Sequence, residues 1–379
     1  MNNAAQSYLD LVRFLRVDLE PGGATARAKG VIASQADWAQ ILCLADTEHM
    51  TGALAVALRD QDLLEMIPKP IRAALARRSL MGAEISSRIR RQALEAVSLL
   101  NAAGVTPLIL KGGLHFFEAT PETLGTRVVR DLDIVVPTDR IYDCIESLHD
   151  AGYRPEGEDD GWTYHYRPMH HPDHLVAIEL HIMPGEQRGF LTCEEAWAGA
   201  VPVACPGRKL VALAPEHRIA HNIFHSEIQD HGFALGDFSL RQLYDLAGIC
   251  ARFEKDIAWD AILERMDRHG IGAPFRARMH MAVALLGAPV PSIAVGGLRS
   301  RLHLRRSFWQ LRSQWLMNRA RWIAGVLSRF NRYHIDLLYE CGTTGLALQT
   351  SRCRHAWDIM RRHRFDFDKR LVENGRRLL

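Results

Sequence analysis

The sequence predicts an α+β protein in which a compact α/β unit is flanked at both ends by helical regions. Two observations predict this fold class: β-type runs alternate with helical runs between about residues 90 and 205, and helical apolar spacing dominates on either side. The composition, with 47% apolar and 24% charged residues among 379, is typical of a globular protein of more than one structural unit.

We divide the chain into four expected parts. These are an N-terminal helical region at 1–92, the α/β core at 93–205, a helical region packing on that core at 206–290, and a basic C-terminal helical region at 291–379.

The first expected elements are helices. An apolar helix face recurs at i, i+3, i+4 and i+7 in the residues Trp38, Ile41, Leu42 and Ala45. A second run, from Ala93 to Leu100, ends before Gly104, a residue type that commonly follows a helix C-terminus. The β-type run 105–110 comes next, and Lys111 then opens another apparent helix.

The remaining expected elements complete the core and lead into a helical half. We expect strands at 132–136, ended by Pro137, and at 176–182, with a helix at 139–151 between them. After Pro215 the pattern is helical to the C-terminus, and the Gly- and Pro-rich stretch 287–297 is the best candidate linker.

Two aspartates on the expected strand predict a metal site. Asp131 and Asp133 are two residues apart, so their side chains point to the same face, which we expect to be the solvent side. Carboxylates that close repel each other unless a cation lies between them, and Mg²⁺ prefers such oxygen ligands. A bridge to Arg127 or Arg130 is the structural alternative.

Further residues strengthen this interpretation. Lys111, Gly112 and Gly113 stand at a strand-to-helix junction, where free backbone N–H groups favour a phosphate and glycine permits close approach. Glu179 supplies a third acid on the following strand, with His181 on the same face. A phosphate cradle with three carboxylates favours two-metal phosphoryl or nucleotidyl transfer. Lys111 as a plain solvated lysine, and Glu179 as a surface acid, remain alternatives.

The chain also resembles a known family. The pattern from Ala93 to Val136, with L-N-x-A-G, then K-G, then R-x-x-x-D-x-D, is similar to the uncharacterised nucleotidyltransferases of the polymerase-β-like superfamily. The segment around Trp38, the run 213–225 and the run Arg241 to Asp245 also resemble this family, so that the resemblance spans about residues 34–292.

The resemblance implies a polymerase-β-like core with a mixed sheet and a set of site residues. It implies metal binding by Asp131, Asp133 and Glu179, which would also be catalytic. Nucleotide binding is implied for Lys111, Gly112, Gly113, Arg127, Arg130 and His181. The family strand usually carries Asp where this chain has Glu179, and a small residue is commoner at Arg130.

The implied reaction is metal-dependent transfer of NMP from an NTP, ATP first among them, to a hydroxyl of a small molecule, sugar or peptide. Mg²⁺ or Mn²⁺ is the expected cofactor. The alternative is a catalytically silent module whose basic C-terminal region binds an anionic partner; a nucleic-acid-directed transferase is less favoured.

Other patterns carry weaker expectations. His217, His221 and His225 are four apart on one expected helix and match a zinc pair in spacing, but we favour partly buried, hydrogen-bonding roles. The loop histidines at 165, 170, 171 and 174 have no diagnostic spacing. We expect Trp309, Trp315 and Trp322 in the C-terminal region to be core residues, as aromatics at helical spacing usually are.

The charge distribution and the cysteine content limit the classes of protein that remain possible. From Arg299 onward the sequence has eighteen Lys and Arg and six Asp and Glu, which gives a net charge of +12. The first 298 residues therefore carry a net charge of −9. The seven scattered cysteines argue against a disulfide framework or cysteine zinc site. No signal peptide or membrane-spanning stretch is recognised, and we expect a cytoplasmic location.

Overall fold

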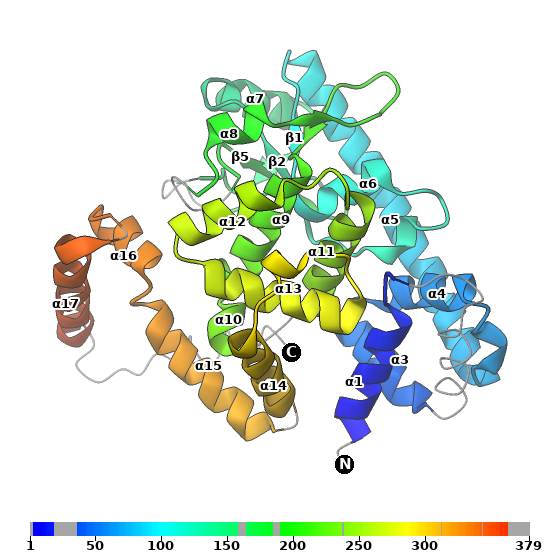
Figure 1. Cartoon of the computed structure of the whole chain (residues 1–379). Coiled ribbons are helices and arrows are strands. Elements are labelled where there is room, and N and C mark those ends of the chain that lie inside the picture. The colour runs from blue at the N-terminus through cyan, green and yellow to red at the C-terminus, as the bar shows by residue number, and fades with distance from the viewer. Residues whose placement is uncertain are drawn as a thin grey trace.

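A mixed seven-stranded sheet lies at the centre of the α/β core (Figure 1). The computed structural model describes residues 3–18, 36–157, 164–184, 190–236, 239–311, 313–342 and 344–362. The strand order is β3-β4-β5-β2-β1-β7-β6, in which β2 pairs with β5, and β1 with β7, in parallel, while the other neighbours are antiparallel. The α+β fold class is thereby confirmed, including its mixed sheet.

The two longest strands are the central pair. They are β2 (Asp131–Val135) and β5 (Ala177–His181), close to the predicted 132–136 and 176–182. Nearly all their residues are buried, which fits their apolar composition. The other strands have two residues each: β1 (Leu108–Ile109), β3 (Arg154–Pro155), β4 (Met169–His170), β6 (Val201–Pro202) and β7 (Val211–Ala212).

A long helix backs the sheet and ties β5 to the N-terminal region. This helix, α5 (Lys69–Ala102), runs without interruption across residue 92, the boundary predicted between the first two parts. Gln92, fully buried, donates from Nε2 to the carbonyl of Val176 at 2.8 Å and accepts from the Val176 N–H at 3.4 Å. Because a buried amide needs both partners, this pair fixes the start of β5 on α5.

The N-terminal helices form as the apolar spacing predicts. The face Trp38, Ile41, Leu42 and Ala45 is buried on α3, and the Asp37 carboxylate caps this helix by accepting from the Gln40 N–H. The elements are α1 (Asn3–Phe14), α3 (Trp38–Thr47), α4 (Thr51–Asp60) and the 3₁₀ helix η1 (Leu64–Met66).

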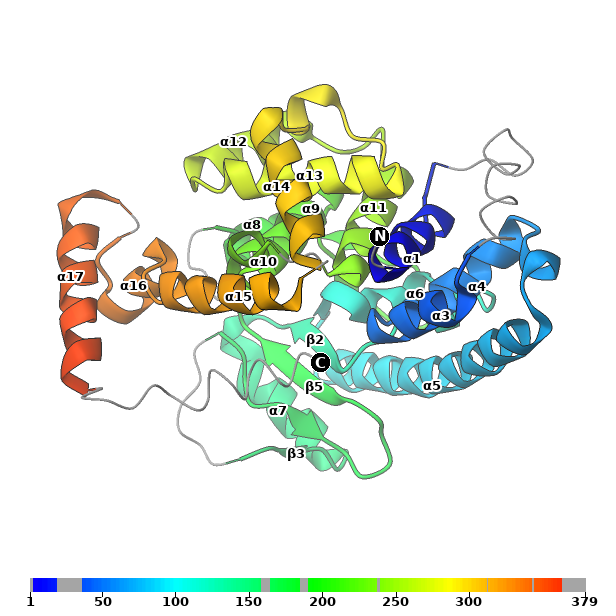
Figure 2. The same cartoon turned by 90° about the horizontal axis from the view of Figure 1, so that it is seen from below.

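Short helices connect the strands of the core. They are the 3₁₀ helices η2 (Lys111–Leu114), η3 (Leu124–Thr126) and η4 (Thr138–Arg140), and the α-helices α6 (His115–Glu118), α7 (Ile141–Asp150) and α8 (Cys193–Ala198). In both views α7 lies on one side of the sheet and the later helices lie on the other (Figures 1 and 2). The active-site candidates therefore face the second side.

The half after Pro215 is helical, as predicted. It contains α9 (Pro215–Ile223), the π-helix η5 (Phe224–Gln229), α10 (Gly232–Leu235), α11 (Leu240–Arg252), α12 (Trp259–Arg268) and α13 (Gly272–Leu286). The predicted break is confirmed at Gly287, whose φ of +69° ends α13 in the left-handed conformation that glycine adopts without strain.

Helices continue beyond the break into the C-terminal region. They are the 3₁₀ helix η6 (Ser292–Ala294), α14 (Leu298–Leu311), α15 (Gln314–Ser328), α16 (Arg332–Tyr339) and α17 (Gly345–Arg362). The expectation that the tryptophans here are core residues is wrong: Trp309, Trp315 and Trp322 are 62%, 60% and 59% exposed. No helix among the described residues is long and apolar enough to cross a membrane.

A buried ion pair joins α13 to the π-helix. Arg278 Nε lies 3.3 Å from Glu227 Oε1, with both side chains almost fully buried, and Arg278 also donates to the Ser239 carbonyl. Removing one partner of such a pair leaves an uncompensated buried charge.

We therefore expect Arg278→Met to lower the free energy of unfolding by about 3–5 kcal/mol. Urea denaturation followed by circular dichroism measures this. Arg268→Met is the matched control, because its pair with Glu264 is solvent-exposed and is worth about 1 kcal/mol at most. Equal losses of unfolding free energy in the two variants would contradict the stabilising role of the buried pair.

Candidate active site

The register of the central strand pair brings two acids face to face. In the parallel pairing of β2 with β5, Asp133 lies opposite Glu179, and Val135 lies opposite His181. Side chains two residues apart on a strand share a face, so Asp131 and Asp133, and likewise Glu179 and His181, project to the same side of the sheet.

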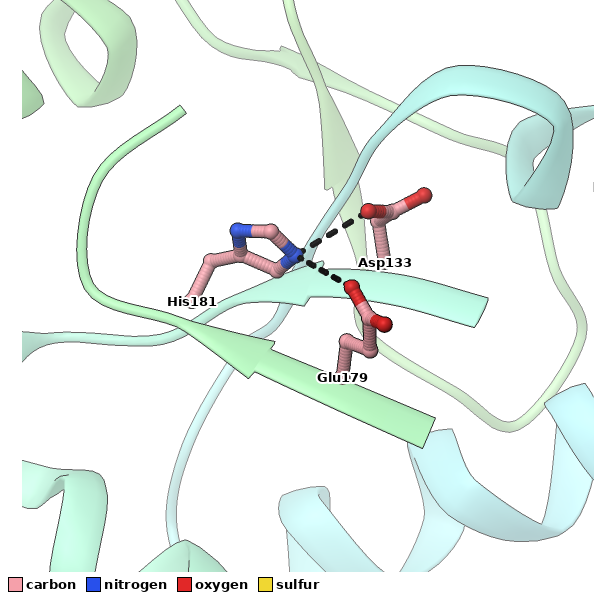
Figure 3. A group of neighbouring side chains, drawn as sticks. All are labelled: Asp133, Glu179 and His181. Atoms are coloured by element: carbon pink, nitrogen blue, oxygen red, sulfur yellow. Dashed lines mark ion pairs between the residues drawn. The ribbon is translucent and has the colours of Figure 1, made fainter. Parts of the chain in front are cut away.

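Three of these side chains converge on one point (Figure 3). Ligand atoms of Asp133, Glu179 and His181 all lie within 4.8 Å of one another. His181 Nε2 is 3.0 Å from Asp133 Oδ1 and 3.6 Å from Glu179 Oε2, at angles that make no well-formed hydrogen bond. Oxygen and imidazole donors in this arrangement fit a divalent cation.

Asp131 and Asp133 differ in environment, contrary to the expectation of a shared solvent-side edge. Asp133 is only 1% exposed, whereas Asp131, at the first position of the strand, is half-buried and lines a neighbouring cavity. Asp131 is not part of the three-residue convergence. Both aspartates pair with β5, but the His181 side chain covers Asp133, whereas Asp131 lies beside the cavity.

Lys111 contacts the buried aspartate from the predicted phosphate turn. Its Nζ lies 2.7 Å from Asp133 Oδ1. The lysine backbone has a φ of +46°, a conformation uncommon for a non-glycine residue, which the turn between β1 and η2 requires. The junction is therefore where the sequence predicted it, although the strand before it is short.

A side chain at the next position would clash with its neighbours, and one at the position after it would be crowded. A Cβ on Gly112 would lie 2.5 Å from Val129 Cγ1 and 3.0 Å from Arg127 Nη2. A Cβ on Gly113 would lie 3.3 Å from Ile109 Cγ2. Both glycines are buried, so the turn packs directly under the strand that carries the aspartates.

Charges within the convergence are balanced by cations of the chain itself. Burial opposes ionisation of Asp133, but His181 and Lys111 hold the pKa of its carboxyl well below its usual value. Contact with His181 lowers the pKa of Glu179. Burial opposes the charged forms of His181 and Lys111, yet the carboxylates raise the pKa of each. Burial and the neighbouring Asp133 raise the pKa of Asp131.

A cavity of about 390 Å³ opens beside the convergence, lined by Asp131 of the same strand and by Lys111, which pairs with Asp133. Six basic side chains line this cavity against three acidic ones, Glu118, Asp131 and Asp245. The basic residues are Lys111, Arg127, Arg130, Arg218, Arg241 and Arg252. An excess of positive charge in a recess favours an anionic ligand.

The two arginines predicted to bind nucleotide both line the cavity. Arg127 Nη2 pairs with Asp245 Oδ2 of α11 at 2.8 Å, and Arg130 Nη2 lies 3.1 Å from His49 Nε2. Neither bridges the two strand aspartates by a contact among the described residues, so the structural alternative for Asp131 and Asp133 finds no support there.

Sequence reasoning missed Arg241 as a site residue. Its side chain is partly buried in the cavity, and no carboxylate of the described residues pairs with it within 4.0 Å. Burial, and then Arg127, lower the pKa of Arg241, while Asp245 and Asp131 oppose this shift. Its place in the run 241–245, which resembles the family, was the available signal.

The helical histidines do not assemble into a metal site in the described part of the chain. His221 is buried, with Nε2 2.7 Å from the Pro184 carbonyl, and burial lowers its pKa to about 3. His225 Nδ1 lies 3.3 Å from Asp230 Oδ2. Both line the cavity, and the one ligand cluster among the described residues excludes them. The buried, hydrogen-bonding interpretation is thus supported for His221.

The loop histidines lie away from the cavity lining, with one near the convergence. The ring of His165 is 5.2 Å from that of His181, and its Nδ1 is 2.8 Å from the Tyr166 carbonyl. His174 Nε2 pairs with Glu95 at 3.0 Å, on the opposite side of the strand start.

A comparison with protein families shows which family the chain belongs to. The family described as uncharacterised nucleotidyltransferase matches residues 34–287, about two-thirds of the chain. The chain belongs to this family. No curated protein and no solved structure matches it significantly. The family places Lys111, the two strand aspartates and Glu179 inside its span, and leaves α14 to α17 outside.

Membership in a nucleotidyltransferase family implies a divalent metal, and the observed donors fit one. Two ionised carboxylates and an imidazole nitrogen without a well-formed hydrogen bond meet in a buried place. Bringing a divalent cation there would relieve the repulsion between the carboxylates.

We therefore expect Asp133→Asn and Glu179→Gln each to weaken Mn²⁺ binding at least tenfold, because each removes an anionic ligand. Isothermal titration of the full chain with Mn²⁺ measures this. Asp139→Asn, an exposed acid just after the same strand, is the control and should bind as the unchanged chain does. Equal affinity in all four proteins would place the metal elsewhere.

Proposed function

We propose that the chain transfers a nucleoside monophosphate from an NTP to a hydroxyl acceptor and releases pyrophosphate. The observation that carries the proposal is the convergence of Asp133, Glu179 and His181 next to an arginine-lined cavity, with Lys111 of the cavity lining in contact with Asp133. Family membership supports the reaction class.

Asp133 and Glu179 would hold the metal, with His181 beside them and Asp131 at the cavity rim. A divalent metal, Mg²⁺ or Mn²⁺, would supply charge neutralisation at the phosphates and lower the pKa of the acceptor hydroxyl. The set of converging side chains differs from the expected trio in one respect: the sequence predicted Asp131 as a ligand, and His181 stands in its place in the convergence.

The remaining side chains act on the nucleotide. Lys111 leaves Asp133 for the phosphates, and Arg127, Arg130 and Arg241 neutralise the charge that develops on the departing pyrophosphate. Gly112 and Gly113 let those phosphates approach the backbone. ATP is the nucleotide we would test first.

Glu179 would accept the proton of the attacking hydroxyl. The acceptor oxygen bonds to the α-phosphorus, the bond from that phosphorus to the bridging oxygen breaks, and pyrophosphate leaves. Proton transfer of this kind contributes roughly 10²–10⁴-fold to a rate. The acceptor class, a hydroxyl of a small molecule, sugar or peptide, stays a proposal; a nucleic acid acceptor is less favoured.

The competing proposal is a catalytically silent module that binds an anion. The observation in its favour is the 2.7 Å contact of Lys111 with Asp133, which satisfies the aspartate without a metal. We favour the enzyme because the cation excess lies in a recess rather than on an open face.

The test is pyrophosphate release with each of the four NTPs and Mg²⁺ or Mn²⁺, with and without a cell-extract acceptor pool. We expect metal-dependent turnover that falls at least about 10²-fold in Asp133→Asn. Asp139→Asn controls for the loss of one acid. Nucleotide binding without turnover in any condition would favour the silent module.

A second variant tests the cavity as the nucleotide site. Arg241→Gln should weaken binding of a non-hydrolysable ATP analogue about 10- to 100-fold, because a charge-assisted hydrogen bond to phosphate is worth about 1.5–3 kcal/mol. Arg268→Gln, on the exposed face of α12, is the control. Unchanged affinity in Arg241→Gln would remove this arginine from the site.

A further inference from the structure

Helix α14 presents an apolar stripe, flanked by arginines, to the outside. The four residues it buries are Ser300, His303, Ser307 and Gln310. The residues it exposes at i, i+4, i+7 and i+11 are Leu298, Leu302, Arg305 and Trp309. Leu304 and Phe308 pack against the main core, so the exposed stripe is a second apolar surface of this helix, where a surface helix normally carries polar residues.

Helix α15 repeats the outward stripe. At the same spacing it exposes Trp315, Arg319, Trp322 and Val326. The guanidinium of Arg319 lies over the ring of Trp315, 4.3 Å from its centroid. The side facing the protein carries Met317, which is 6% exposed. The stripe on each of these two packed helices therefore contains three exposed apolar side chains and one arginine, and Leu311, Ile323 and Leu327 are exposed beside them.

Exposed apolar side chains are concentrated in the C-terminal region, and the three tryptophans of the described residues before it are shielded. Thirteen of the twenty-one exposed large hydrophobic side chains among the described residues lie between 293 and 357. Trp38 is 5% exposed, and Trp197 and Trp259 pack against the main core. Contiguous exposed apolar surface of this kind marks an interaction site.

The chemistry of the partner follows from the charge. Between Leu298 and Ile335 the sequence has nine arginines and no aspartate or glutamate. In both views α15 leads away from helices α1 to α5 toward α16 and α17, so that the stripes lie at the periphery of the molecule (Figures 1 and 2). The partner is therefore anionic and also offers an apolar layer.

We propose that the outward stripes of α14 and α15 bind the surface of an anionic lipid bilayer, with the helices lying in the interface. Tryptophan and aliphatic residues enter the boundary between headgroups and acyl chains, while arginines reach the phosphates. Each basic residue near such a surface contributes about 1 kcal/mol. This inference does not depend on the proposed transferase reaction.

Two other occupants fit the stripes less well. Single-stranded nucleic acid uses aromatic stacking, and the exposed Leu298, Leu302 and Val326 offer it nothing to stack on. A second copy in a symmetric dimer would bring the same arginines against each other, which repels.

The test is co-sedimentation of the full chain with vesicles of phosphatidylcholine alone, or with about 30% phosphatidylglycerol added to give an anionic surface. We expect binding to the anionic vesicles, a blue shift of tryptophan emission, and at least about a tenfold weaker affinity in Trp315→Ala/Trp322→Ala. Both side chains are about 60% exposed, so the fold should be retained.

The matched control is Leu80→Ala/Met81→Ala, which removes two exposed apolar side chains from α5 and should leave vesicle binding unchanged. Absence of vesicle binding, or equal loss in both double variants, would overturn the proposal. So would a tryptophan-dependent dimer seen by light scattering, or tryptophan-dependent binding to a single-stranded RNA oligonucleotide in place of vesicles.

Discussion

The parallel pairing of β2 with β5 is the constraint on which the site depends. It places Asp133 opposite Glu179 and brings His181 over Asp133, in a region where burial penalises an unpaired charge. Neither acid could remain ionised there alone. Lys111, held by a strained turn, and His181 supply the compensating charge, and the glycines after Lys111 permit the turn to approach.

That constraint also explains why the cavity forms where it does. With Asp133 covered by β5, Asp131 at the strand start is the carboxylate that reaches the recess, and α11 closes the recess with Arg241 and Asp245. The N-terminal helices contribute as well, since His49 contacts Arg130. Segments from three predicted parts of the chain thus meet at one place, although the division into those parts stays a prediction.

Local sequence signals predicted the two central strands and the helical regions, but not the short strands β3, β4, β6 and β7 or which elements are neighbours. The strand at 132–136, the junction at Lys111 and the break at Gly287 all follow from composition and spacing, and the structure places them within a residue or so. The burial of Asp133 and the role of His181 in the convergence depend on which strands are neighbours, and side-chain alternation alone does not encode this. The exposed tryptophans were missed because helical spacing reports that a helix has an apolar face and not which way it points.

The most direct test of the site is a crystal structure of the full chain soaked with Mn²⁺ and a non-hydrolysable ATP analogue, with the metal located by anomalous scattering. The account predicts a peak at about 2.0–2.5 Å from carboxylate oxygens of Asp133 and Glu179, with the phosphates against Lys111 and Arg241. A metal and nucleotide bound elsewhere, with Lys111 still on Asp133, would contradict it.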